Sequence, residues 1–246
     1  MIRQNKMRLY VWLAVLMIVF LSSDGLAYEE VVVSNGGTIR GVVKVQGKVP
    51  KLAPLQVTKA KEVCKNVPNE TLVVGPGQGV RYAVVTLEGI SRGKAVEKEV
   101  AHELDNARCR FVPHVLAASV DQFLFLKNSD PILHTAHALF HDGQPQFNVG
   151  LYPGRTSRKP LVAAGIVKVL CEVHPWMNAY IVVTEHPYHA VTDAYGEYEI
   201  TDVPPGNYRL KVWHELLGEE QKAVEVKGGI ATEVNFGLSS ASGVKK

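Results

Sequence analysis

The sequence is poor in sulfur and lacks the charge pattern of a nucleic-acid-binding protein. Its 246 residues include only three cysteines and four methionines, and 27 Lys and Arg stand against 24 Asp and Glu. Because there is no sustained basic stripe with interleaved aromatic residues, we expect no nucleic acid partner. The 46% content of hydrophobic residues excludes a disordered chain, and the length allows one or two domains.

Several sequence motifs that are typical of enzymes are also absent. The chain contains no His-Glu-x-x-His motif and no phosphate-binding glycine loop. It also lacks the repeated His-x-His pairs from which a multinuclear copper oxidase centre is usually built. We therefore expect no enzymatic turnover of an organic substrate.

The N-terminus has the layout of a secretory signal peptide. A basic stretch, Arg3–Arg8, precedes the uncharged run Leu9–Leu21, and small residues at Gly25 and Ala27 suit a cleavage site. The run is shorter than the roughly 20 residues of a spanning helix. We expect export to a periplasmic or extracellular location, with membrane contact only through residues 1–27 before cleavage. An uncleaved membrane anchor is the alternative.

The odd number of cysteines leaves one thiol unpaired in an oxidising compartment. Cys64 and Cys109 lie in polar, loop-like stretches, and we expect a disulfide between them. Cys171 ends an apolar strand pattern and is followed by His and Met, so we expect metal coordination to protect its thiol. A buried inert Cys171, or its pairing with Cys109, is the alternative.

Cys171, His174 and Met177 place a thiolate, an imidazole and a thioether in one short segment. A fourth ligand must come from elsewhere, and His134 is the candidate because it follows a strand broken at residues 128–131. One thiolate, two imidazoles and a weak thioether form the ligand set of electron-transfer copper. His137 is the rival for the remote position.

Two alternatives concern the metal and the thioether. Zinc in structural sites prefers four Cys or His ligands, and methionine is a poor ligand for it. Met177 could instead be a core residue, which would change the axial ligand and leave the site in place.

Short apolar and alternating segments separated by turn residues predict an all-β protein. We expect strands at residues 38–45, 80–87, 95–104, 111–118, 123–127, 166–170 and 178–184. Residues 144–158 are rich in Pro and Gly and read as a loop. The ligand segment would then join two neighbouring strands, where a rigid scaffold can hold it.

The segment after residue 185 changes character. Thr192–Gly196 and Pro204–Tyr208 carry the Thr-Asp-x-x-Gly and Pro-Pro-Gly-x-Tyr patterns. In these it resembles the carboxypeptidase regulatory-like, transthyretin-like β-sandwich, which implies a fold and says almost nothing about function. We expect a first domain at 28–185 and a smaller β-sandwich at 186–246, with Gly37–Val45 as a possible strand of the second.

Residues 80–185 resemble the cupredoxins. The Cys-x2-His-x2-Met loop is similar to that of amicyanin, and Val120–Asp130 is similar to the strand that leads to the first histidine. The resemblance implies a Greek-key β-sandwich with one type 1 copper bound by His134, Cys171, His174 and Met177. Many members have Asn or Ser after the first histidine, where this chain has Thr135.

We expect Thr135 to tie the two ligand-bearing segments together through its hydroxyl. The resemblance also implies a soluble redox partner, such as a cytochrome c or a dehydrogenase, with electrons leaving through His174. Pro175 and Trp176 would form an apolar docking patch beside it.

Two other functions compete with electron transfer. One is a structural or ligand-binding protein of the cell envelope with a degenerate copper site. The other is copper handling, which the additional histidines favour.

Overall fold

Strands form almost all the regular structure between residues 28 and 239, the range that the computed structural model describes. The only helical element in this range is the 3-10 turn η1 (Pro76–Gln78). None of the described residues forms a helix with the length and apolarity needed to cross a membrane. The predicted signal peptide lies outside the described residues.

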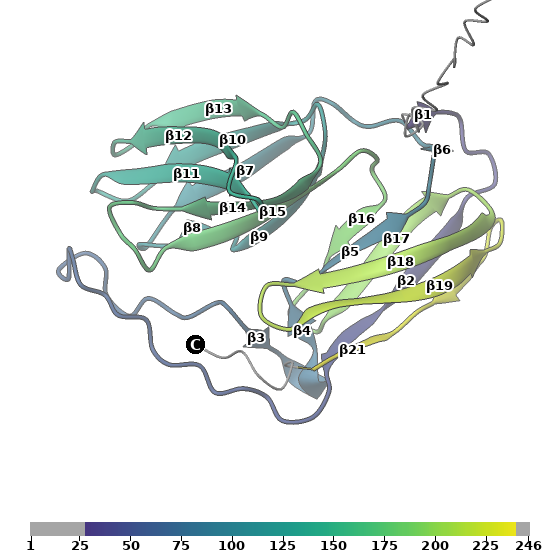
Figure 1. Cartoon of the computed structure of the whole chain (residues 1–246), viewed down its shortest axis with the longest axis horizontal. Coiled ribbons are helices and arrows are strands. Elements are labelled where there is room, and N and C mark those ends of the chain that lie inside the picture. The colour runs from purple at the N-terminus through teal and green to yellow at the C-terminus, as the bar shows by residue number, and fades with distance from the viewer. Residues whose placement is uncertain (1–27, 240–246) are drawn as a thin grey trace, which may run out of the picture.

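Two sheets pack into a first sandwich (Figure 1). The four-stranded sheet has the order β13 (Thr156–Pro160), β10 (Phe123–Asn128), β7 (Ala101–Asn106), β8 (Phe111–Val112). The five-stranded sheet has the order β12 (Pro145–Leu151), β11 (His134–Phe140), β14 (Gly165–Leu170), β15 (Asn178–Thr184), β9 (Val115–Ser119). Their alternate residues fill one apolar core, which includes Leu104, Leu124, Leu126 and Ile181.

A second sandwich lies beside the first (Figure 1). One of its sheets contains β16 (His189–Val191), β5 (Val84–Glu88), β18 (Gly206–His214) and β19 (Gly218–Val226). The other contains β17 (Glu197–Val203), β2 (Gly37–Val45), β20 (Ala231–Glu233) and β21 (Phe236–Leu238). Two short pairs complete the structure, β1 (Glu29–Glu30) with β6 (Arg92–Gly93) and β3 (Val73–Val74) with β4 (Val80–Arg81). The all-β fold with two sandwiches is therefore confirmed.

The second sandwich takes strands from both ends of the sequence. β2 pairs with β17, β20 and β21, as the sequence allowed for Gly37–Val45. β5 lies between β16 and β18, although it falls within the predicted first domain, 28–185. The boundary at residue 185 therefore does not separate the strands of the two sandwiches, because the opening strands of the chain pair with its closing ones.

Most predicted strands are present, but residues 144–158 are not a loop. They form β12 and the start of β13, each at the edge of its sheet. Edge strands tolerate proline and exposed polar side chains, and Pro145 is the first residue of β12. The predicted strand at 95–104 begins only at Ala101, in β7.

The two sandwiches share an apolar interface. Val84 of β5 and Val182 of β15 belong to a small buried cluster that also takes residues from β9, β14 and β18. Their neighbours Val85 and Ile181 point the other way, into the two sandwich cores. Both faces of β5 and β15 are thus buried, which explains their nearly continuous apolar sequences.

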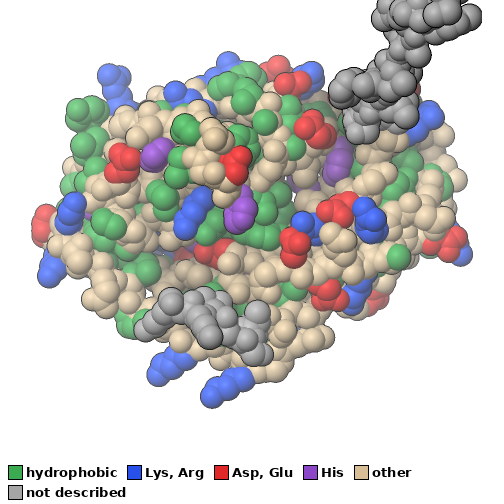
Figure 2. Space-filling view, viewed as in Figure 1, with side chains coloured by type: hydrophobic (Ala, Val, Ile, Leu, Met, Phe, Trp, Pro, Cys, Tyr) green, Lys and Arg blue, Asp and Glu red, His purple; other side chains and the backbone are tan. Residues whose placement is uncertain are grey.

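Residues 46–72, here called the strap, connect β2 to β3 without forming a strand. Figure 1 shows the strap running beneath the first sandwich and back. Leu55, Val57 and Val63 pack on the first core, and Cys64 is buried in it. On the face drawn in Figure 2, basic and acidic side chains are interspersed.

Protonation of His214 should destabilise the second sandwich. Burial, and then the charge of His114, lower the pKa of His214 to about 4, and its Nδ1 accepts hydrogen bonds from the amides of Leu216 (3.2 Å) and Leu217 (3.3 Å). The unfolded chain binds this proton near pH 6.5. Neutral His214 therefore makes its full contribution to the free energy of unfolding above pH 6.5. This contribution is lost as the pH falls to about 4, and the loss is at most about 3 kcal/mol.

Chemical denaturation across this pH range measures the effect. As the pH falls through this range, the free energy of unfolding should decrease less in the variant His214→Gln than in the wild-type protein. Parallel pH profiles of the two proteins would contradict the role assigned to His214.

Candidate metal centre

Strand pairing brings two distant segments to one end of the first sandwich. β11 runs antiparallel to β14, with His137 opposite Leu170, so the start of β11 lies beside the end of β14. His134 is the first residue of β11, and Cys171 directly follows β14. The predicted strand break after Asn128 therefore delivers His134 to the end of the sandwich where Cys171 lies.

The ligand segment closes the hairpin between β14 and β15, as predicted. Leu170 pairs with Asn178, so residues 171–177 form its loop. The amide of Cys171 donates to the carbonyl of Met177 (3.2 Å), and the amide of Met177 donates to the carbonyl of His174 (2.9 Å). These two bonds tighten the loop, in which Cys171 and His174 are buried.

His134, Cys171 and His174 meet in the interior. The Nδ1 atoms of the two histidines are 3.0 Å apart, and the sulfur of Cys171 lies 3.8 Å from Nδ1 of His134 and 3.7 Å from Nδ1 of His174. The three residues are between 0 and 2% exposed. Three atoms that can each donate an electron pair to a metal ion therefore lie close together in the protein interior.

This spacing fits a first-row metal ion. An ion about 2.0 Å from each nitrogen and about 2.3 Å from the sulfur, in a trigonal arrangement, implies separations of about 3.5–3.7 Å. The observed separations of 3.0–3.8 Å are close to these values. The donor chemistry favours copper, because one soft thiolate and two imidazoles suit both of its oxidation states.

Met177 is buried at 1% exposure in the same core cluster as Cys171. The structure thus places it within the first sandwich, at the end of the ligand loop. The Met177 thioether as the axial ligand stays a prediction.

Thr135 ties the two segments together. Its hydroxyl accepts a hydrogen bond from the amide of Glu172 (2.8 Å), and its own amide donates to the sulfur of Cys171 (3.4 Å). Burial alone would raise the pKa of the Cys171 thiol, but the contact with His134 and the hydrogen bonds from Thr135 and the His174 amide outweigh it and lower that pKa. The site favours the thiolate, which is the form that binds metal.

His137 does not join the cluster. It lies three residues after His134, so its side chain projects from the other face of β11. There its Nδ1 lies 2.8 Å from a carboxylate oxygen of Glu172, and its side chain is 25% exposed. The geometry brings His134, and not its rival, to Cys171.

The predicted disulfide is confirmed, with Cys64 bonded to Cys109. Cys171, the third cysteine of the described chain, is buried and unpaired. A second group of possible ligands, Cys109 with Asp130 and His134, shares a histidine with the first. Its sulfur belongs to the disulfide, so this group offers no free thiolate.

The expected docking patch is not exposed. His174 is 2% and Trp176 is 8% exposed, and only Pro175 of the three faces solvent. Leu55 of the strap lines a cavity of about 20 Å³ together with Trp176 and Met177. The prediction was wrong about Trp176, because the strap packs over the ligand loop.

The environment also affects the second histidine. Burial, and then the charges of His134 and Lys59, lower the pKa of His174. Its neutral form, the form that binds metal, is therefore favoured. Lys59 belongs to the strap, which gives a second sign that the strap lies near the site.

Gly89–Gly93 match the Gly-x-Ser-x-Gly pattern of a nucleophile elbow. An elbow needs a strand, a sharp turn and a helix, but here Ser91 lies in an exposed turn before β6, and residues 28–239 contain no α-helix. The match therefore does not carry a catalytic role.

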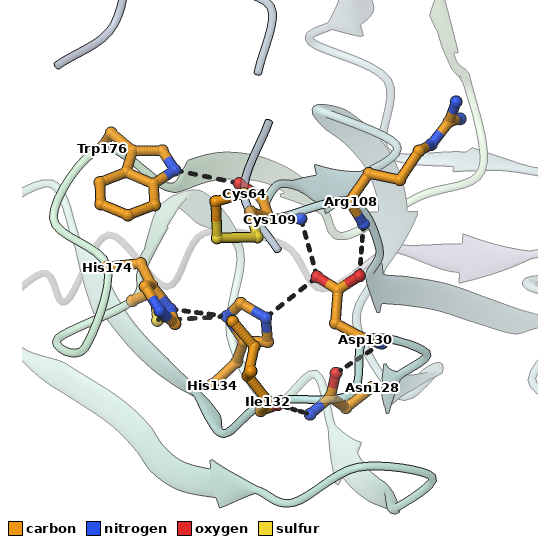
Figure 3. The surroundings of a disulfide bond; sticks show 10 residues. Cys64, Arg108, Cys109, Asn128, Asp130, Ile132, His134, His174 and Trp176 are labelled. Atoms are coloured by element: carbon orange, nitrogen blue, oxygen red, sulfur yellow. Dashed lines mark hydrogen bonds and ion pairs between the residues drawn. A yellow bond between two sulfur atoms is a disulfide. The ribbon is translucent and has the colours of Figure 1, made fainter. Parts of the chain in front are cut away.

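Sequence reasoning also missed Asp130 and the indole contact of Trp176. A carboxylate oxygen of Asp130 lies 3.1 Å from Nε2 of His134, and the Trp176 indole donates to the carbonyl of Cys109 (3.1 Å; Figure 3). The strand break at 128–131 was the only local signal for Asp130. Nothing near Trp176 in sequence points to Cys109.

Removing the Thr135 hydroxyl should make the thiolate form of Cys171 less stable relative to the thiol. In Thr135→Val the amide bond to sulfur remains, but the bond from Glu172 and the hydroxyl contact with sulfur (3.8 Å) are lost. We expect a higher pKa for Cys171 in the metal-free protein, measured by the ultraviolet absorbance of the thiolate. Thr135→Ser keeps the hydroxyl and should behave as wild type, whereas an unchanged pKa in Thr135→Val would contradict this role.

Known proteins match two parts of the chain. Residues 164–239 match the family model of the carboxypeptidase regulatory-like domain. No curated protein matches the chain at a significant level. The chain resembles a purple cupredoxin from Nitrosopumilus maritimus with 20% identity, covering 34% of this chain and 99% of that one, with a TM-score of 0.31.

Two further solved structures are similar. Amicyanin from Paracoccus versutus shares 12% identity over 34% of this chain and 80% of its own, with a TM-score of 0.31. A copper-containing nitrite reductase from Thermus scotoductus shares 25% identity over 38% of this chain and 24% of its own, with a TM-score of 0.32. The chain is thus similar to cupredoxins over about a third of its length, and residues 164–239 match the carboxypeptidase regulatory-like domain.

Proposed function

We propose that this protein is an exported type 1 copper protein that transfers electrons. His134, Cys171 and His174 would be the strong ligands, and Met177 the weak axial one. The single observation that carries the proposal is the convergence of three buried donor atoms within 3.0–3.8 Å of one another.

The surroundings suit electron transfer. Bound copper would supply the one-electron chemistry, while the chain holds its donors on two paired strands and a short hairpin loop. Hydrogen bonds from Thr135 stabilise the Cys171 thiolate, and burial keeps water out. Such a fixed geometry limits rearrangement when the oxidation state changes.

The same burial argues against the two competing functions. A copper-handling protein must release its ion to another molecule, but His174 is only 2% exposed. In a degenerate site we would not expect the Nδ1 atoms of His134 and His174 both to face the thiol of Cys171. Electron transfer needs neither release of the metal nor an open substrate cavity at it.

The disulfide supports the proposed location. Cys64–Cys109 is buried, and such bonds form and persist in oxidising compartments. Residues 1–27, with their signal-peptide layout, would direct export to the periplasm or the cell exterior. The proposed partner is a soluble redox protein, such as a cytochrome c or a dehydrogenase.

Copper titration tests the proposal. Wild-type metal-free protein should gain an intense blue thiolate-to-copper absorption that saturates at one equivalent of copper(II) and bleaches reversibly on reduction. Cys171→Ser should abolish the absorption, because the charge transfer needs the sulfur.

His137→Ala is the matched control, since it removes a histidine of β11 that lies outside the cluster. It should turn blue as wild type does. A wild-type protein that stays colourless at stoichiometric copper would refute the proposed function, and loss of colour in His137→Ala would refute the ligand assignment.

A further inference from the structure

The carboxylate of Asp130 is held by two consecutive backbone amides. The amide of Arg108 donates to Oδ1 (2.6 Å) and that of Cys109 donates to Oδ2 (2.7 Å; Figure 3). Asp130 is 7% exposed. The two amides therefore fix both oxygens of this buried carboxylate in place.

The two amides belong to a tight turn at residues 107–110, here called the cystine turn. The amide of Ala107 donates to the carbonyl of Arg110 (3.0 Å), and Arg108 and Cys109 both have a φ of 56°. Two successive residues in the left-handed region are rare without glycine and direct their amides to one side, as in an anion-binding nest. The disulfide to Cys64 fastens this turn to the strap.

Asp130 is also fixed from its own side. Oδ1 of Asn128 accepts from the amide of Asp130 (3.0 Å), while Nδ2 of Asn128 donates to the carbonyls of Ile132 (2.8 Å) and Leu151 (2.7 Å). The buried Asn128 therefore braces the turn that carries Asp130. The carboxylate can hold His134 without moving to reach it.

The third contact of the carboxylate is His134, whose Nε2 lies 3.1 Å from Oδ2 of Asp130. An ionised carboxylate only accepts hydrogen bonds, so Nε2 of His134 must carry the proton. In the neutral ring this leaves the lone pair on Nδ1, the atom that faces Cys171 and His174. The hydrogen bond selects both the ring orientation and the tautomer that a metal ion needs.

We propose that Asp130, held by the cystine turn, is a positioning residue that presets His134 as a metal ligand before any metal binds. The inference deepens the proposed copper function and rests on it for the effect on copper. The protonation of the His134 ring at Nε2 in the metal-free protein follows from the contacts of Asp130 alone. Partners that orient a ligating histidine in this way typically change metal affinity by about 10–100-fold.

The cystine turn is also linked to the second histidine, through Trp176. The Trp176 indole donates to the carbonyl of Cys109 (3.1 Å), and its ring centroid lies 5.2 Å from that of His174. The turn therefore reaches His134 through Asp130 and His174 through Trp176. Both histidine ligands are supported by the residue that forms the disulfide with Cys64.

Nitrogen-15 NMR of the metal-free wild-type protein at neutral pH tests the tautomer directly. We expect His134 to be protonated at Nε2 and unprotonated at Nδ1. This readout needs neither copper nor a variant, so it separates this inference from the proposed function. A His134 protonated at Nδ1 would overturn the inference, even if the protein binds copper.

Asp130→Asn tests the consequence for the metal. The amide group keeps the shape but cannot accept from all three donors, so we expect a mixed or reversed tautomer and copper(II) affinity reduced about 10–100-fold. The negative charge of Asp130 stabilises copper(II) more than copper(I). The midpoint potential should therefore rise when the substitution removes this charge.

Asp105→Asn is the matched control. Asp105 lies on β7 and accepts hydrogen bonds from the amide (3.1 Å) and hydroxyl (2.7 Å) of Ser129, but does not contact His134. It should leave the tautomer and potential as in wild type. Equal effects of the two substitutions would reduce Asp130 to a structural role and overturn the inference; if Asp130→Asn does not fold, the wild-type tautomer decides.

Discussion

The register between β11, β14 and β15 is the constraint on which the candidate site depends. Antiparallel pairing of β11 with β14 puts the first residue of one strand beside the residue that follows the other. Pairing of β14 with β15 fixes the size of the loop that carries His174 and Met177. A slip of one residue would turn His134 to the opposite face and separate it from Cys171. The site is therefore a consequence of sheet pairing within the first sandwich.

Around this arrangement the chain adds supports from distant segments. The strap covers the ligand loop, the disulfide fastens the strap to the cystine turn, and Asp130 connects that turn to His134. Thr135 connects the first ligand segment to the second. Each support joins residues that are far apart in sequence, so the geometry of the donors depends on the tertiary structure and not on the loop alone. The second sandwich packs on the outer face of the sheet that carries the ligands.

The sequence predicts what local chemistry and periodicity decide. The ligand loop, its flanking strands and the unpaired Cys171 all follow from neighbouring residues and the odd cysteine count. His134 could be preferred over His137 because the strand break precedes it. Asp130 could not be assigned a role, since its partners Arg108 and Cys109 come close only on folding. The exposure of Trp176 was mispredicted for the same reason, and β12 and β13 were missed because edge strands tolerate loop-like residues.

The central claim is that one thiolate and two imidazoles of the first sandwich bind a single copper ion. X-ray absorption of the protein loaded with one equivalent of copper measures the neighbours of that ion most directly. We expect one short sulfur and two nitrogen neighbours of copper in wild type, with the sulfur absent in Cys171→Ser. A wild-type spectrum with only nitrogen and oxygen neighbours would contradict it.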